Sequence, residues 1–96
     1  MTDRSIVIAW IGGNCPVQAE GTIGGEPFYF RARDERWTIA IGGDVVENTF
    51  GRGAADQPSW LYEEEYSGGP SAAGWMTENE ARTFIEEAAQ RYFSEK

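Results

Sequence analysis

The side chains that could carry chemistry in this chain are mainly carboxylates and aromatic rings. Its 96 residues include 16 Asp and Glu, four tryptophans and four tyrosines, but no histidine. Without histidine, Ser-His-Asp and Cys-His catalytic arrangements and histidine metal ligands are excluded. Carboxylate catalysis needs two acids held in different environments across a cleft, and nothing in the pattern marks a cleft. We therefore expect a non-enzymatic protein without a cofactor.

A cysteine and a group of polar residues could in principle act as a nucleophile and as metal ligands, but neither has the neighbouring residues that such a site needs. Cys15 precedes Pro16 with no activating base or cation nearby in the sequence, so we expect a structural or incidental thiol. Asp44, Glu47 and Asn48 share a glycine-bounded segment but lack the ligand spacing of an EF-hand loop. We therefore expect no metal site.

The strongest candidate for partner binding is a short segment that combines acids with aromatic rings. Three aromatic residues frame three adjacent glutamates: Trp60, Tyr62, Glu63, Glu64, Glu65 and Tyr66. Carboxylates spread over a rigid surface can occupy a groove built for phosphates, and Trp and Tyr are enriched among the residues that dominate interfaces. Four glutamates further along can extend the surface: Glu78, Glu80, Glu86 and Glu87. A charged edge strand that resists aggregation explains the segment equally well.

A second candidate surface lies on the expected sheet face opposite the core, at Tyr29, Arg31 and Arg33. An aromatic ring with arginines on an open sheet face can stack on RNA or bind an acidic protein patch. The strand register also places Glu20 opposite Tyr29, which favours a solvated face with cross-strand pairing.

The charge balance limits the classes of partner. The net charge is -8, and residues 56–96 hold nine acids against three bases. This acidity disfavours direct binding to nucleic acid or to anionic membrane surfaces, and it favours a protein or ribonucleoprotein with a basic surface. The single cysteine, the absence of a long apolar run and the absence of a signal-peptide pattern at the N-terminus predict a cytoplasmic protein.

The elements that must position these residues are strands followed by one helix. Residues 5–11 form an apolar run typical of a strand that is covered on both faces, or at least largely buried. Alternating residues over 17–23, 28–33 and 37–41, with a turn at Gly24-Gly25, predict a three-stranded meander. Two-residue turns at Gly24-Gly25 and at Asp34-Glu35 fix the register. They place Phe28 opposite Gly21 and Ile41, and Phe30 opposite Ala19 and Ile39. Residues 60–66 are a candidate for a fourth or fifth strand.

A helix is expected from Thr77 to about Phe93. Thr77 and Glu80 have the spacing of a capping box. One apolar stripe follows at helical spacing: Ala81, Phe84, Ile85, Ala88 and Tyr92. The sequence thus predicts a single α+β domain over residues 1–96, with an antiparallel meander of about four to five strands packed on one face by the C-terminal helix.

In size, acidity and strands-then-helix layout, the chain resembles small inhibitors encoded by phages and mobile elements, of which anti-CRISPR proteins are the largest group. The resemblance rests on no shared motif. It implies a protein that binds a host surveillance complex or nuclease and blocks its nucleic-acid site. A sheet-face module using Tyr29, Arg31 and Arg33, and a small accessory or oligomeric structural protein, are the alternatives. A homodimer is also compatible with the sequence, because exposed strand edges and spare aromatic residues often pair.

Overall fold

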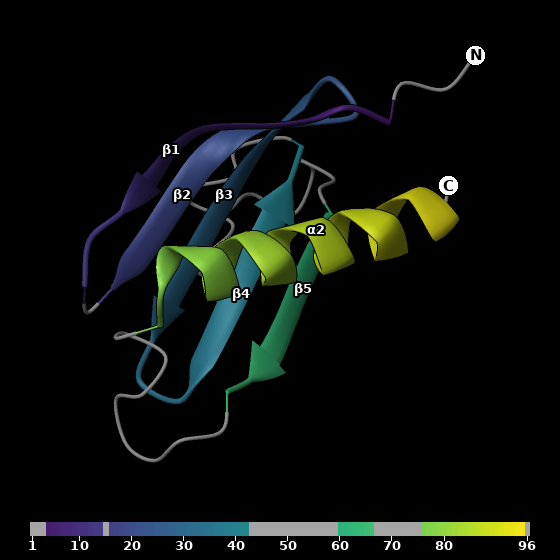
Figure 1. Ribbon diagram of the computed structural model, residues 1–96. Coiled ribbons are helices and arrows are strands. Elements are labelled where there is room, and N and C mark those ends of the chain that lie inside the picture. Colours follow the sequence, from purple (N-terminus) through teal and green to yellow (C-terminus); the bar gives the residue numbers. More distant parts are fainter. Residues whose placement is uncertain (1–3, 15, 43–59, 67–75, 96) are drawn as a thin grey trace.

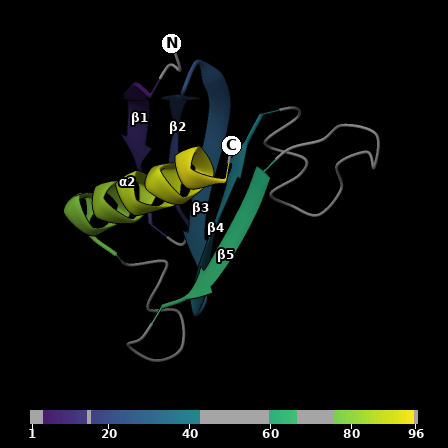
Figure 2. The same cartoon turned by 90° about the vertical axis from the view of Figure 1, so that its right-hand side faces the viewer.

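The computed structural model describes residues 4–14, 16–42, 60–66 and 76–95. This part of the chain forms one antiparallel sheet in the order β1-β2-β3-β4-β5, with one helix, α2, across one face (Figures 1 and 2). The elements are β1 Ile6–Gly12, β2 Val17–Ile23, β3 Glu26–Arg33, β4 Arg36–Ile41, β5 Trp60–Glu65 and α2 Glu78–Ser94. The predicted α+β architecture is confirmed. In the described ranges, no helix is both long and apolar enough to cross a membrane.

The register of the central meander is the one that the turns predict. Phe28 pairs with Gly21 and Ile41, and Phe30 pairs with Ala19 and Ile39. Gly24 and Gly25 both have positive φ, which glycine adopts without steric cost. Because side chains alternate between faces along a strand, this register places the large apolar residues of β3 and β4 on the same face.

The core lies between this sheet face and α2. Phe28, Phe30 and Ile39 are fully buried, and Ile85 and Ala88 of the helix pack in the same cluster. Burial of each large side chain stabilises the fold by roughly 1.5–3 kcal/mol. Small residues at the sheet positions beside these rings let the helix approach closely: Ala19 and Ala32.

The helix begins where the capping signal predicts. Thr77 is the N-cap, and its hydroxyl accepts a hydrogen bond from the Glu80 backbone N–H at 3.1 Å. The Glu80 carboxylate in turn accepts from the Thr77 backbone N–H at 3.0 Å, which completes the capping box. Two buried residues, Ala89 and Phe93, lie outside the predicted stripe and widen the face that packs on the sheet.

The expectation that the first strand is covered on both faces is wrong. β1 is an edge strand, and Val7 and Trp10 are 53% and 51% exposed on the face away from α2. Only Ile6, Ile8 and Ile11 pack against the core. The spacing of these three breaks strict alternation because a β-bulge inserts Ala9 between Ile8 and Trp10.

Several expected features lie outside the described residues. These are Cys15 and the polar residues of the glycine-bounded segment, Asp44, Glu47 and Asn48.

Gly21 permits the close approach of three strands. A Cβ at this position would overlap the Val7 carbonyl oxygen of β1 and lie 2.9 Å from the Phe28 ring of β3. The Val7 oxygen belongs to backbone and the Phe28 ring is fully buried, so neither can move without disturbing the sheet. The Phe28 ring thus covers Gly21, as aromatic side chains often do beside a glycine of a neighbouring strand.

We expect Gly21→Ala to lower the free energy of unfolding by at least about 1–3 kcal/mol, because it overpacks the ladder between β1 and β2. Chemical denaturation followed by circular dichroism would measure the change. Gly12→Ala is the matched control, since its Cβ would meet the Trp10 ring at an ordinary 3.4 Å. Equal stability of Gly21→Ala and the wild type would contradict this account of the contact.

Candidate partner-binding surface

The alternation of side chains along β5 divides the predicted acidic segment between two faces. Trp60, Tyr62 and Glu64 pair with Ile41, Ile39 and Trp37, whose side chains face α2. Glu63 and Glu65 pair with Thr38 and Arg36 on the opposite face. The expectation of one surface formed by all three glutamates is therefore wrong, because consecutive residues of a strand point in opposite directions.

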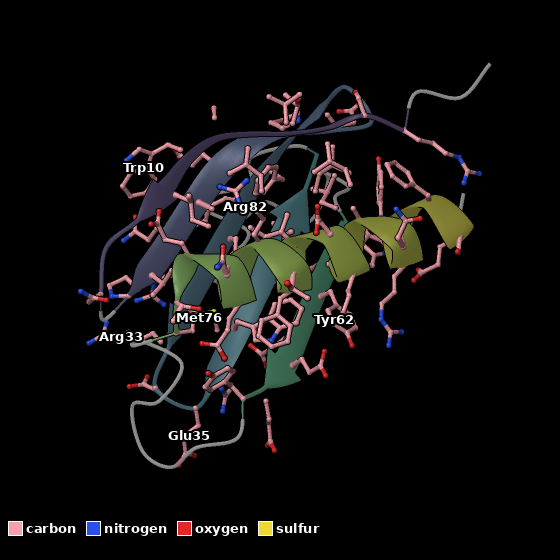
Figure 3. All side chains as sticks on the ribbon, viewed as in Figure 1. Trp10, Arg33, Glu35, Tyr62, Met76 and Arg82 are labelled. Carbon is pink, nitrogen blue, oxygen red and sulfur yellow. The ribbon has the colours of Figure 1, made fainter. Side chains whose placement is uncertain are left out.

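The aromatic residues of this segment serve the packing of the fold. The Trp60 and Tyr62 rings stack with centroids 5.8 Å apart, and Trp60 meets Tyr92 of α2 edge-on at 5.7 Å. Tyr62 also contacts Trp37 at 5.5 Å (Figure 3 shows Tyr62 beside the helix). Since each ring is only partly exposed, it presents an edge to solvent while its face seals the core.

The polar tip of each aromatic side chain donates a hydrogen bond to a carboxylate. Trp60 Nε1–H donates to Glu95 at 3.0 Å, and the Tyr66 hydroxyl donates to Glu80 at 2.7 Å. The Tyr62 hydroxyl donates to Glu64 at 3.1 Å. These bonds hold three carboxylates in a row along the line where β5 meets α2. Hydrogen bonds to ionised groups are shorter and stronger than those between neutral groups, so the positions are well defined.

We call this row, together with Glu87, the acidic seam: Glu64, Glu80, Glu87 and Glu95. Glu87 belongs to it because it lines one surface depression together with Arg91 and Glu95. One cation, Arg91, lies at the seam with its guanidinium over the Tyr62 ring, 4.9 Å from the centroid. A surface depression beside it is lined by Glu87, Gln90, Arg91, Ser94 and Glu95.

These contacts shift the pKa values of Tyr62, Tyr66 and Glu80. The hydrogen bond to Glu80 and burial raise the pKa of Tyr66, while burial and the bond to Glu64 raise the pKa of Tyr62. Backbone and Tyr66 hydrogen bonds lower the pKa of Glu80. Tyr62 and Tyr66 therefore stay protonated donors and Glu80 stays ionised at neutral pH.

The opposite face of β5 is organised differently. Glu63 forms an ion pair with Arg36 at 3.3 Å, and it accepts a hydrogen bond from Thr38 at 3.3 Å. Both charged side chains of the pair are more than half exposed, so the pair contributes little to stability. Glu63 thus has its charge partly compensated by Arg36.

The second predicted surface is altered by burial. Tyr29 lies opposite Glu20, as expected, but it is only 5% exposed. Its ring therefore cannot act as an open stacking platform. Arg31 is half-buried and Arg33 is exposed. The surface therefore retains two cations but offers a partner no open aromatic ring.

Two glutamates that complete the seam were reached only in part from the sequence. Glu80 was expected both in the helix cap and on the extended acidic surface, but its bond to Tyr66 was not predicted, and Glu95 was not singled out. No local pattern identifies them, because their partners Tyr66 and Trp60 lie 14 and 35 residues away. In the described ranges, no group of three or more Cys, Asp or Glu residues is arranged to hold a metal ion.

Comparison with known proteins gives no relative: no family model, no curated protein and no solved structure matches the chain. The functional assignment therefore rests on the geometry of the described residues.

We expect Glu80 to make stability depend on pH in the acidic range. Its folded pKa lies below the usual value of 4.5, so its contribution is complete above that value and is lost as the pH falls through the folded pKa. Glu80→Gln should be less stable than the wild type at neutral pH, and the difference should shrink toward acid. Guanidinium denaturation at a series of pH values measures this difference.

Glu78→Gln is the control, because Glu78 lies in the same first turn but makes none of the hydrogen bonds that hold Glu80. A stability difference for Glu80→Gln that stays constant with pH would exclude a contribution from the ionised carboxylate.

Proposed function

We propose that this chain is a non-enzymatic inhibitor that binds a basic, nucleic-acid-binding surface of a cytoplasmic host complex through its acidic seam. The partner class that best suits this surface is a nuclease or a CRISPR-type ribonucleoprotein. The proposal rests on one observation: Trp60, Tyr62 and Tyr66 hold carboxylates along one line of the molecule by hydrogen bonds.

Fixed carboxylates favour this function over a merely solvated acidic face. Binding costs less when charged groups are already ordered, because fewer side-chain rotamers are lost. A groove that binds nucleic acid presents cations at intervals along a backbone, and a row of carboxylates on a rigid strand and helix can meet several of them together. The net charge of -8 would also accelerate encounter with such a groove at low salt.

The rings of the seam suit the same interface. Trp60, Tyr62 and Tyr66 are partly exposed and rigidly packed, so they can add apolar contact without further loss of conformational freedom. The alternative sheet-face module is weaker, because the buried Tyr29 removes the stacking contact on which it depended.

The test combines identification of the partner with competition. The tagged chain is used to recover partners from nuclease-treated host lysate, and the purified partner is then assayed for binding of labelled nucleic acid. We expect the chain to displace the nucleic acid, with apparent affinity falling as salt rises. Glu64→Arg with Glu87→Arg should weaken displacement by about a hundredfold or more, because buried interface carboxylates are replaced by like charges.

Glu20→Arg with Glu26→Arg is the matched control, since it changes the net charge equally on exposed residues of β2 and β3, away from β5. It should retain nearly all of the displacement. Recovery of only metabolic proteins, or simultaneous binding of the chain and nucleic acid by the partner, would contradict the proposed function.

A further inference from the structure

The strand at the edge of the sheet far from the acidic seam has the sequence of an internal strand. β1 reads IVIAWIG, with apolar residues directed to both faces. On the face away from α2, Val7 and Trp10 are each about half exposed. On the helix face, Ile6, Ile8 and Ile11 are only partly buried. Such a strand normally has a neighbour on each side and cover on both faces.

The two edges of the sheet differ in how they are protected. β5 carries Glu63, Glu64 and Glu65, which oppose pairing with another strand. β1 carries no charged residue and no proline. An edge strand presents unpaired backbone N–H and C=O groups, and β1 leaves them without the usual protection by charge. Trp10 stands at this edge in Figure 3, away from the helix.

We propose that β1 is the interface of a homodimer, in which the β1 strands of two copies pair antiparallel about a twofold axis. The two sheets then form one continuous sheet of ten strands, five from each copy. The pairing joins Val7 and Trp10 of both copies on one face, and extends the row of isoleucines on the other. This interface is separate from the acidic seam, so it neither requires nor excludes the proposed function.

Electrostatics permits a second copy as the occupant of this edge. Each chain carries a net charge of -8, so copies associate only where little charge is brought together. The seam runs along β5, at the opposite edge from β1. With strands about 4.8 Å apart, the two seams of the dimer lie roughly 40 Å from each other. This separation exceeds the screening length of about 8–10 Å at physiological salt several times over.

The shape of the edge also favours a second copy over a foreign strand. The bulge at Ala9 increases the local twist of β1, which by itself discourages pairing with a flat strand. A twofold-related β1 carries the same bulge, the same twist and the same length of seven residues. A closed twofold contact also uses up both free edges at once, so it does not propagate into a filament.

The test is the mass of the purified chain in solution, measured by sedimentation equilibrium from low micromolar to near-millimolar concentration. We expect a species with twice the 10.7 kDa of one chain. The double variant Val7→Lys with Trp10→Lys should raise the dimer dissociation constant by at least about tenfold, because the twofold axis brings like charges together. Circular dichroism checks that the variant is folded.

Leu61→Lys is the matched control. Leu61 is 52% exposed on the same sheet face, but on β5 at the other edge, so this variant should remain dimeric. A wild type that is monomeric at all concentrations would overturn the proposal. So would a dimer that survives the double variant, or one that dissociates in Leu61→Lys.

Hydrogen exchange of the wild type gives a measurement that does not depend on the folding of a variant. Amides of Ile6–Gly12 that face outward should exchange more slowly at high concentration than at low concentration, while those of β5 should not change. Protection of β1 that is independent of concentration would count against pairing between copies.

Discussion

The burial of Trp37 is the interaction on which the other parts of the structure depend. The indole is 1% exposed and contacts rings from three elements, namely Phe30 of β3, Tyr62 of β5 and Phe84 of α2. Aromatic pairs contribute about 0.5–1.5 kcal/mol each beyond the area that they bury. The indole N–H has no hydrogen-bond partner among the described residues, which costs about 1–3 kcal/mol. Three ring contacts and complete burial offset this cost.

The acidic seam depends on the same cluster. Tyr62 stacks on Trp60 and contacts Trp37, and it also donates to Glu64, so the position of this carboxylate is set by the packing of the core. Tyr66 meets Phe84 edge-on and donates to Glu80. The same side chains thus close the core and fix the surface charge. A substitution that loosens the packing of Trp37 would therefore also disturb the positions of the seam carboxylates.

Local rules predicted the centre of the fold and failed at its edge. The pairing of Phe28 and Phe30 followed from two short turns and the alternation of apolar residues, because both are properties of neighbouring positions. The exposed outer face of β1 did not, because composition does not tell whether a strand has one neighbour or two. The division of Glu63, Glu64 and Glu65 between faces was within reach of the same alternation rule. The bonds of Glu80 and Glu95 were not, since they depend on where a distant helix lies.

The bulge at Ala9 determines which face of the sheet each later residue of the first strand occupies. On the β2 side, Gly21 and Glu20 are consecutive, whereas their partners Ile8 and Trp10 are separated by one extra residue. That residue reverses the facing of everything after it, turning Trp10 outward and Ile11 inward. If β1 paired with β2 without the bulge, the same sequence would turn Trp10 inward and Ile11 outward. Deletion of Ala9 would instead restore regular pairing and leave both side chains on their present faces. The facing of this stretch is therefore set by how the strand pairs, and not by its residue types alone.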